Sequence, residues 1–432
     1  MGATFAALRY RNYRIWAGAD FLSVIGTWMQ VLGINWYVLQ KSGSAASMGF
    51  TVLLQTLPAL VLSLWGGALA DRLPARPLLI VTQLTHGALA AALATIAWTD
   101  VGGLPLVYAI SLLGGAVSAI EGPVMGRWCS TLVDRETLGN ALALGSLINS
   151  TARILGMSAG AVLVAAVGPA MLFAVNAVSF VAVVPALLAV RLRDLHIPQA
   201  EPARSEPGTA LDAIRVGFAY LRRQPVILTV LALAVVLGSF GRNYQVTMAA
   251  MSDGPLQAGA SGYGFLSTVF AIGTVVGALV AGRQRSLGYR TLVAAGLIAS
   301  LLQITAGLAP STWTFAAVIL PIAAAAVVID TTVSTRVQLD TDGAMRGRVL
   351  AALGVTSAIS GAIGAPLLGW LSEVAGPRQT LVLAGLVAAA ASAVAGIGLA
   401  RLRGRQVRQH LAAAGPTIWR AEPEPVGTHP AD

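Results

Sequence analysis

Long apolar stretches, separated by short polar segments, make up most of the chain. Each stretch contains about 20 residues, the length that an α-helix needs to cross the hydrocarbon core of a bilayer. Several neighbouring stretches are joined by only a few residues, so their helices are expected to run antiparallel. The pattern predicts twelve membrane-spanning helices, near residues 15–39, 48–70, 77–98, 104–126, 140–167, 169–190, 226–250, 262–282, 290–309, 312–335, 347–374 and 378–400.

A longer polar segment, residues 191–225, divides these helices into two sets of six. Its prolines and charges are followed by an amphipathic stretch from Leu211 to Arg223, which we interpret as an interfacial helix; a plain disordered linker is the alternative. The expected parts of the chain are an N-terminal six-helix half (1–190), a cytoplasmic linker (191–225), a C-terminal six-helix half (226–400) and a disordered cytoplasmic tail (401–432).

Two short internal similarities suggest that the halves arose by duplication. Gly67-Ala68-Leu69 returns as Gly277-Ala278-Leu279, and Leu132-Val133-Asp134-Arg135 is matched by Leu339-Asp340-Thr341-Asp342 at nearly the same offset. The expected fold is an all-α membrane protein with twelve transmembrane helices in two pseudo-symmetric six-helix halves.

Composition excludes most soluble proteins. Hydrophobic residues make up 56% of the 432 residues and charged residues only 11%, whereas soluble domains carry about 25% charged residues. The net charge of +10 would suit nucleic acid, but the basic residues punctuate apolar runs instead of lining one polar face, so no nucleic-acid partner is expected.

Basic residues also set the expected orientation. With the N-terminus placed in the cytoplasm, nearly all arginines fall in inside segments, and the outside loops hold only Lys41 and Arg378. The positive-inside rule then places both termini in the cytoplasm, in a multi-pass protein of the bacterial cytoplasmic (inner) membrane.

Neither a metal site nor a cofactor is expected. Cys129 is the only cysteine, so no cysteine cluster can form. The histidines have no metal-ligand spacing; they are His86, His196, His410 and His429.

The segment from Gly66 to Arg76 carries an acid and two arginines between the second and third spans. Its small residues allow a close approach of two membrane helices, and its charges can make fixed contacts. The segment resembles the loop between helices 2 and 3 of major facilitator superfamily transporters, which contacts helix 11 when the cytoplasmic side is shut. The resemblance implies a gate formed by Gly67, Asp71, Arg72 and Arg76. A simple topology anchor is the alternative, and it fits Arg76 better than Asp71.

Further motifs are spread over both halves. They are Arg11-Asn12-Tyr13-Arg14, Ile25-Gly26-Thr27-Trp28-Met29-Gln30, Leu132-Val133-Asp134-Arg135-Glu136-Thr137-Leu138-Gly139-Asn140-Ala141, Asn176-Ala177-Val178-Ser179-Phe180, Tyr220-Leu221-Arg222-Arg223-Gln224-Pro225, Gly262-Tyr263-Gly264-Phe265-Leu266 and Arg346-Gly347-Arg348-Val349. As a set they resemble the superfamily branch that contains the bacterial enterobactin exporter and drug–proton antiporters, and the resemblance covers nearly all of residues 9–400.

This resemblance implies a secondary active transporter that exports a small hydrophobic or amphiphilic molecule, such as a drug, a siderophore or a secondary metabolite, by alternating access. It also implies coupling to proton influx, and the absence of a G-x-x-x-x-G-K-[S/T] phosphate loop agrees with that. A lipid flippase of the lysophospholipid type is the alternative within the superfamily. The expected partners are the substrate, protons and the lipid bilayer; the protein is expected to be a monomer and not an enzyme.

One feature departs from the antiporter pattern. Such antiporters often carry a Gly-Pro step after an arginine in helix 5, but here Arg153-Ile154-Leu155-Gly156 is followed by Met157-Ser158. The Gly156-x-x-x-Gly160 packing face remains, so a close helix contact is expected at Gly156.

Ionisable residues inside a bilayer are costly, so each is a candidate functional residue. In the superfamily, helices 1, 4, 7 and 10 line the central cavity, and the resemblance places one candidate on each: Asp20, Glu121, Arg242 and Asp330. We hypothesise that the acids line an inward cavity where at least one exchanges a proton. Alternatively they pair with Arg153 of the fifth span, or with backbone, and hold helices together. Trp28 is the expected aromatic residue of the pocket.

Overall fold

The computed structural model describes residues 3–196, 216–217, 219–241, 243–284, 287–342 and 345–413, without the side chains of residues 3–4, 63–72, 346–347, 351 and 403–413. These residues form helices and no strand, in the order η1 (Ala3–Arg9), α1 (Arg11–Ser42), α2 (Ala45–Arg72), α3 (Ala75–Thr99), α4 (Gly103–Thr131), α5 (Leu138–Val167), α6 (Pro169–Ala189), η2 (Leu192–Asp194), α8 (Pro225–Gly241), α9 (Tyr244–Asp253), α10 (Gly259–Arg283), α11 (Tyr289–Gly307), α12 (Thr312–Leu339), α13 (Arg346–Val374) and α14 (Pro377–Ala413). The described chain contains 12 segments long and apolar enough to cross a membrane, so the predicted all-α fold with twelve spans is confirmed.

The seventh span is two helices, whereas the apolar pattern predicted one. α8 ends at Gly241 and α9 begins at Tyr244, after a cluster of residues with low helix propensity. Nδ2 of Asn243 donates hydrogen bonds to the backbone oxygens of Gly238 (3.3 Å) and Ser239 (3.2 Å). The carbonyl groups at the break therefore keep partners within an apolar environment, which a membrane requires.

The segment expected as a loop between the second and third spans is mostly helical. α2 continues through Arg72, and only Leu73 and Pro74 separate it from α3. Pro74 disfavours a helical conformation at Leu73 before it and is itself the extended N-cap residue of α3, so α2 ends at this point.

The last helix is longer than expected. α14 continues to Ala413, past the boundary near residue 400 where a tail was expected. Arginine, glutamine, leucine and alanine dominate residues 401–413, and all four favour helix. The remainder of that tail (414–432) and most of the amphipathic linker stretch lie outside the described residues.

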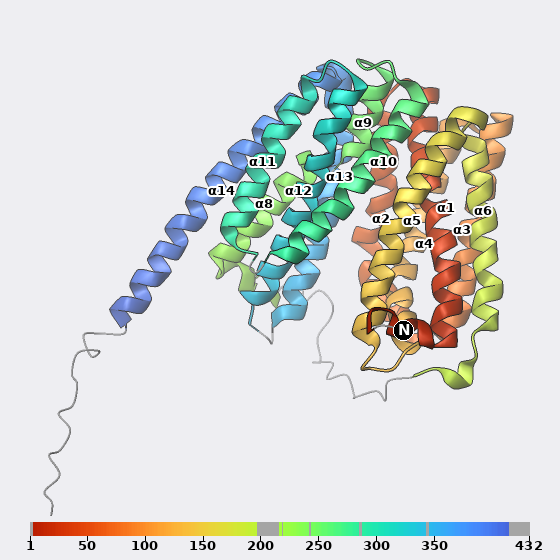
Figure 1. The fold of residues 1–432 in the computed structure, drawn as a ribbon, viewed down its shortest axis with the longest axis horizontal. Helices are drawn as coiled ribbons and strands as arrows, with labels where there is room; N and C mark the ends of the chain where they lie inside the picture. The colour runs from red at the N-terminus through yellow and green to blue at the C-terminus, as the bar shows by residue number, and fades with distance from the viewer. Residues whose placement is uncertain are drawn as a thin grey trace, which may run out of the picture.

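The helices form two groups, α1–α6 and α8–α14, which lie together at one end and diverge toward the end that holds the N-terminus (Figure 1). We call these the closed end and the open end. One cluster of buried apolar residues contains members of both groups, including Tyr37 of α1, Met251 of α9 and Phe315 of α12. Toward the open end the core divides, with one cluster around Trp128 in the first group and another around Leu292 in the second.

Small residues hold the groups together at the closed end. A Cβ atom added to Gly264 of α10 would lie 2.1 Å from the Cβ of Ala161 of α5, and one added to Gly369 of α13 would lie 2.3 Å from the backbone oxygen of Ala45 of α2. Such contacts allow helix backbones to approach closely, as at small-residue helix interfaces in membranes. Two seams, α5–α10 and α2–α13, therefore close this end.

A carboxylate reinforces the α2–α13 seam. Glu373 of α13 accepts hydrogen bonds from the Ser44 hydroxyl and from the backbone N of Ala46, 3.0 Å away. These groups lie at the N-terminus of α2, where a negative charge is favoured by the unpaired backbone N–H groups. The second group thus caps a helix of the first.

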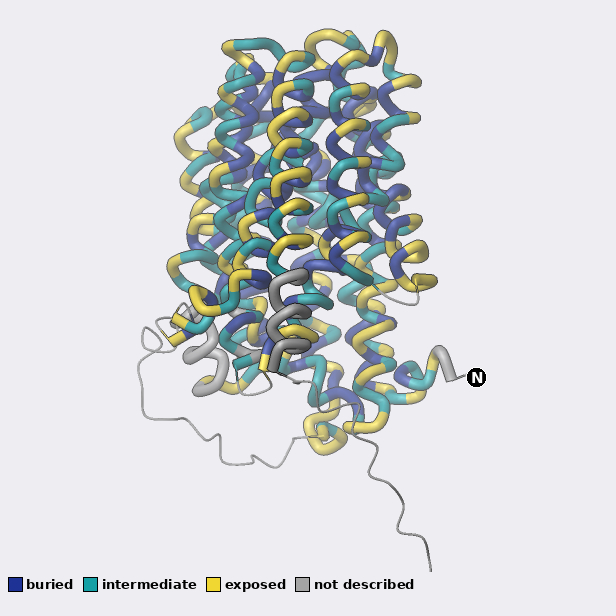
Figure 2. Tube along the Cα trace, turned by 90° about the vertical axis from the view of Figure 1, so that its left-hand side faces the viewer, coloured by how far each residue is buried: buried dark blue, intermediate teal, exposed yellow. Residues whose placement is uncertain are grey.

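Apolar side chains cover the outward faces of the helices. Figure 2 shows exposed positions running along these faces and buried positions between the helices. Val162, Val178 and Val394 are each 69% exposed. Apolar surface of this extent suits contact with lipid tails.

Polar residues of the Arg11-Asn12 motif anchor the C-terminus of α6. Nη1 of Arg11 donates to the backbone oxygen of Ala189 (3.0 Å), and the Asn12 side chain exchanges two hydrogen bonds with the backbone of Arg191 (2.9 and 3.0 Å). Nη2 of Arg76 donates to the oxygen of Leu188 (2.7 Å). Terminal carbonyl groups that lack helical partners are thereby satisfied, and cations are favoured at a helix C-terminus.

We predict that Gly156→Val destabilises the protein by about 1–3 kcal/mol, the usual cost of overpacking a tight interface. A Cβ atom at Gly156 would lie 2.5 Å from the backbone oxygen of Ile25 on α1, whereas nothing lies within 4 Å of one at Gly145, on the same helix. Thermal unfolding of the purified protein measures the effect, with Gly145→Val as the control. Equal melting temperatures for the two variants would contradict the close α1–α5 contact.

Candidate substrate and proton sites

A partly open cavity of about 240 Å³ lies in the first group of helices, between α1, α2, α3, α4 and α6. Most of its wall is apolar, but polar side chains reach it from all five helices: Thr27, Gln30, Gln55, His86, Ser111, Ser118, Glu121 and Asn176. A cavity with many hydrogen-bonding groups is suited to water or to a polar ligand group, whereas a purely apolar one would stay dry.

Glycines bring the walls of this cavity together. A Cβ atom at Gly115 of α4 would lie 2.3 Å from the backbone oxygen of Gln55 on α2, and one at Gly26 of α1 would lie 2.4 Å from Oδ1 of Asn176 on α6. Gly114, which also lines the cavity, has nothing within 4 Å of its Cβ position. Of these two adjacent glycines on α4, Gly115 allows the close contact with α2, and Gly114 leaves space in the cavity.

Glu121 is the only acidic residue among those lining the cavity, and it has two polar partners on α3. Oε1 accepts a hydrogen bond from Nε2 of Gln83 (2.6 Å), and Oε2 lies 3.0 Å from Nε2 of His86. The side chains of His86 and Glu121 are each only 13% exposed. The His86 ring stacks on Phe180 of α6, with 5.1 Å between the ring centroids. The carboxylate is therefore held by groups whose positions are fixed from two further helices.

Asp20 lies on α1, close enough to Glu121 for their charges to interact. Counted from the ends nearest the open end (Arg11, Thr131 and Leu339), Asp20, Glu121 and Asp330 each lie nine or ten residues into a helix. At about 1.5 Å per residue this gives the acids a similar depth. Only Asp20 and Glu121 belong to the same group of helices.

A second polar pair crosses the cavity wall. Nδ2 of Asn176 donates a hydrogen bond to Oε1 of Gln30 (2.8 Å), and the Ser179 hydroxyl lies 2.9 Å from Oδ1 of Asn176. The Ser111 hydroxyl lines the cavity and has no hydrogen-bond partner among the described residues. Since buried hydroxyl groups are normally paired, Ser111 is suited to a bound molecule.

Arg153 lies where the two groups of helices meet. Its Nη2 atom donates a hydrogen bond to the hydroxyl of Thr274 on α10, and its guanidinium carbon lies 5.4 Å from the centroid of the Trp28 ring on α1. Arg153 and Trp28 are thus in contact with each other, and neither lines the cavity around Glu121.

The other candidates occupy different places. Asp330 lies on α12 in the second group and is exposed, so the structure does not bring it to the cavity of Glu121. Arg242 lies outside the described residues, and only the backbone is described for Gly67, Asp71 and Arg72. Arg76 donates to the backbone oxygen of Leu188 at the end of α6, and its role as gate or topology anchor stays a prediction.

Outside the spans, Asp134 ties the α4–α5 connection to the start of α1. It accepts hydrogen bonds from the Tyr10 hydroxyl and from the backbone N of Thr137 (2.8 Å). These bonds, that from Tyr10 foremost, hold the pKa of the Asp134 carboxyl below its usual value. In the second half, the hydroxyl of Tyr220, which precedes the seventh span, donates to Asp342 (3.2 Å), so the two similar sequence segments make similar contacts.

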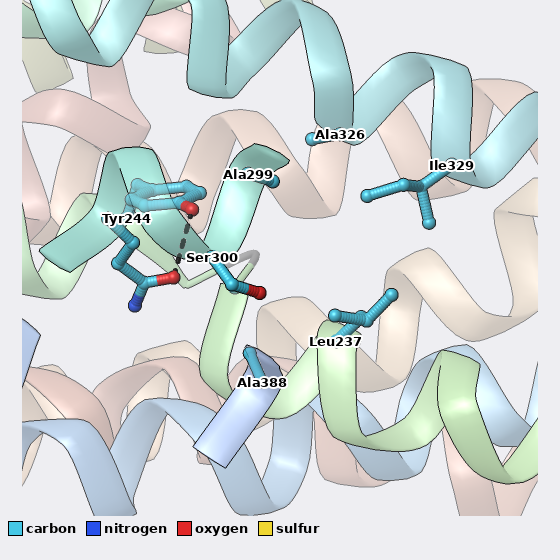
Figure 3. Close-up of a pocket in the computed structure, with 9 residues that line it drawn as sticks. Leu237, Tyr244, Ala299, Ser300, Ala326, Ile329 and Ala388 are labelled. Carbon is cyan, nitrogen blue, oxygen red and sulfur yellow. Dashed lines mark hydrogen bonds between the residues drawn. The ribbon is translucent and has the colours of Figure 1, made fainter. Parts of the chain in front are cut away.

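The second group contains a much smaller cavity, of about 10 Å³, beside the break between α8 and α9 (Figure 3). The Tyr244 hydroxyl donates to Oε1 of Gln303 (3.3 Å), and Nε2 of Gln303 donates to the backbone oxygen of Phe240 (2.8 Å). A space of this size holds about one water molecule. The polar groups beside it therefore support the broken helix, and the cavity itself is too small for a substrate.

Sequence reasoning missed His86, Gln83 and Asn176. His86 was considered only as a metal ligand, although a histidine within a predicted span is itself a candidate functional residue. Gln83 and His86 are three residues apart and so share a helix face. That spacing could have indicated a polar site on the third span, but nothing in it identifies Glu121 as the partner.

We predict an energetic coupling between His86 and Glu121. His86→Ala should destabilise the protein by about 1–3 kcal/mol because it leaves a buried carboxylate oxygen without its partner. In a Glu121→Gln background the same change should cost less, with a coupling free energy of about 0.5–3 kcal/mol. Thermal unfolding of the two single variants and the double variant measures this; additive effects would contradict a direct interaction.

Comparison with known proteins gives consistent results. Residues 2–416 match the family model described as "Transmembrane secretion effector". The chain is 22% identical over 263 residues to the staphyloferrin A transporter of Staphylococcus aureus, covering 61% of this chain and 64% of that protein. It is 24% identical over 363 residues to the enterobactin exporter EntS of Escherichia coli O1:K1, covering 83% and 85%.

Solved structures share the fold. The nucleoside transporter NupG superposes with a TM-score of 0.70 at 15% identity, covering 90% of this chain and 99% of that one. A bacterial homologue of the human lysosomal transporter Spinster, in an inward-facing and unoccupied conformation, gives 0.70 at 14% identity, covering 91% and 98%. The twelve spans, the family match and these neighbours agree: the chain is a multi-pass membrane transporter that belongs to the transmembrane secretion effector family of the major facilitator superfamily.

Proposed function

We propose that this transporter exports a small hydrophobic or amphiphilic molecule, such as a drug, a siderophore or a secondary metabolite, by alternating access coupled to proton influx. The observation that carries the proposal is the combination of two helix groups sealed at one end with a buried His86–Glu121 pair inside the first group. The names of the relatives, a staphyloferrin A transporter and an enterobactin exporter, favour a siderophore-like substrate.

The distribution of arginines supports an orientation with both termini in the cytoplasm. The open end, which holds the N-terminus, then faces the cytoplasm (Figure 1). Substrate enters from that side, and export requires the glycine seams at the closed end to part while the open end shuts. The two six-helix groups move as units in this cycle, because each has its own apolar core away from the shared one.

Glu121 is the proposed site of proton exchange. Its carboxylate lines the cavity, is 13% exposed and is bound by Gln83 and His86 of α3. Proton binding removes the charge that holds His86, so it alters the packing of α3 against α4. The proton thus changes the interior of the group that must tilt during the cycle.

We predict that Glu121→Gln lowers the rate of gradient-driven export about tenfold or more. Coupling between two ligands of one protein typically changes affinity about 5–150-fold, and the expected loss lies in that range. Export of ethidium, Nile red and naphthalene-2-carboxylate is measured in everted vesicles carrying an imposed pH gradient. Glu136→Gln, at an exposed position of the α4–α5 connection, is the control. Unchanged export and pH dependence in Glu121→Gln would remove Glu121 from coupling, and failure of the wild type to move any probe would overturn export of amphiphiles.

We also predict that Gly264→Val opens the closed end. Overpacking of about 1–3 kcal/mol against Ala161 should shift the conformational equilibrium away from the closed-end contact. Spin labels at Thr99→Cys and Leu308→Cys, in a Cys129→Ser background, report the distance between the groups, which should lengthen.

Gly282→Val, on the same helix with nothing within 4 Å of the added Cβ atom, should leave this distance unchanged. The pair Gly264→Ala with Ala161→Gly, which moves the methyl group to the other helix, should restore the short distance. A distance distribution for Gly264→Val identical to that of the wild type would contradict the proposed movement.

A further inference from the structure

The guanidinium group of Arg153 has hydrogen-bonding capacity that the described residues do not fill. Arginine carries five N–H donors, and the described part of the chain supplies one side-chain acceptor, the Thr274 hydroxyl, with the Trp28 ring 5.4 Å away as a further contact. The Thr274 hydroxyl in turn donates to the backbone oxygen of Ala271 (2.6 Å). Nε of Arg153 is buried and has no hydrogen-bond partner among the described residues.

Within the described part of the chain, Arg153 also has no counter-charge. No carboxylate of the described residues forms an ion pair with it within 4.0 Å. Arg336 of α12 provides the contrast, because it stacks on Tyr289 in the same manner, 5.5 Å from the ring centroid, and also pairs with Asp340. A half-buried cation without an anion is costly, and structural arginines normally avoid that state.

Arg153 lies on the seam between the two groups of helices, toward the open end. Along the α5–α10 seam, Ala161 meets Gly264 nearest the closed end, Ser158 meets Thr268 next, and Arg153 meets Thr274 last. About ten residues separate Gly264 from Thr274, so the contact of Arg153 lies about 15 Å along α10 from the tight seam. Of these three α5–α10 contacts it lies nearest the open end, toward which the two groups diverge.

The donors that remain suit a compact oxyanion. The Thr274 hydroxyl takes one of the five N–H groups, and two neighbouring N–H groups of a guanidinium can bind the two oxygens of a carboxylate or phosphate side by side. The Trp28 ring lies against the cation and offers an apolar surface for the body of the molecule. Both groups of helices contribute, through Thr274 on one side and Arg153 with Trp28 on the other.

We infer that Arg153 binds a single anionic group of the transported molecule, a carboxylate, a catecholate or a phosphate, so that the substrates are amphiphilic anions. This inference rests on the proposed export function and adds the substrate class. It also separates the two ligands in space: the anion binds between the groups of helices, and the proton binds inside the first group at Glu121. Exchange of an outgoing anion for an incoming proton moves net positive charge inward, so the membrane potential also drives export.

The test uses a matched pair of probes, benzophenone-4-carboxylate and benzophenone-4-carboxamide, which differ in charge and not in shape. Binding to the full-length protein in phosphatidylcholine nanodiscs is measured by titration calorimetry. The wild type should prefer the carboxylate by about tenfold or more, equivalent to about 1.4 kcal/mol. Arg153→Gln should abolish the preference, and Arg153→Lys, which keeps the charge without the planar fork, should retain part of it.

Arg336→Gln is the matched control, because that arginine also lies against an aromatic ring but already has its carboxylate partner; the preference should persist. Photolysis of the bound carboxylate gives a readout that needs no variant. The cross-links should map to α1, α5 and α10 around Arg153. Equal affinities for the two probes in the wild type, an undiminished preference in Arg153→Gln, or cross-links confined to other helices would overturn the inference.

Two further arms identify the source of the anion and separate this inference from the proposed function. Lysophosphatidylglycerol should displace the carboxylate through Arg153 if the phosphate of a lipid is the natural ligand, and should leave it bound if a soluble anion is. Glu121→Gln should keep the carboxylate preference while losing gradient-driven export. A wild type that binds the carboxylate at Arg153 without gradient-driven export would overturn the proposed function alone, and export without the preference would overturn only the anion site.

Discussion

Close contact between helix backbones, made possible by glycine, is the constraint on which the structure depends. In lipid there is little hydrophobic gain from bringing two apolar helices together, so their association relies on packing and on polar contacts. Gly264 against Ala161 and Gly369 against Ala45 supply that packing between the two groups of helices. Gly26, Gly115 and Gly156 do the same inside the first group, and the first two bring together helices that line its cavity.

The contacts between the two groups of helices differ in kind from the contacts within the first group. At the closed end, small residues bring the backbones of the two groups close together, and large apolar side chains of the shared core, such as Tyr37 and Phe315, must also separate when the groups part. By contrast, the ends of the first group near the N-terminus are tied by directed hydrogen bonds, such as those of Arg11, Asn12 and Arg76 to the end of α6. A transporter built in this way can tilt as two bodies while each body keeps its internal contacts.

The ionisable residues also differ in whether they lie within one group of helices or between the two groups. The His86–Glu121 pair lies within one group, where its neighbours are fixed by packing, and Arg153 lies between the groups, where its surroundings change as they move. A group that exchanges a proton benefits from a protected site, whereas a group that binds a substrate must be reachable from outside. Under the proposed mechanism the two sites communicate through α1, which carries Trp28 beside Arg153 and Asp20 near Glu121.

The sequence by itself determined the number of spans and the membrane environment, because apolar length and the scarcity of charge are local properties that no tertiary contact can reverse. It also indicated Glu121 and Arg153, since an ionisable residue in an apolar run is visible without a structure. It could not place the break at Asn243, nor show that α2 continues to Arg72, because such boundaries depend on which carbonyl groups find partners. Only the tertiary structure decided which charges meet. It paired Glu121 with His86 from another helix, left Asp330 in the other group and gave Arg153 no carboxylate among the described residues, because helix packing sets those distances and residue spacing does not.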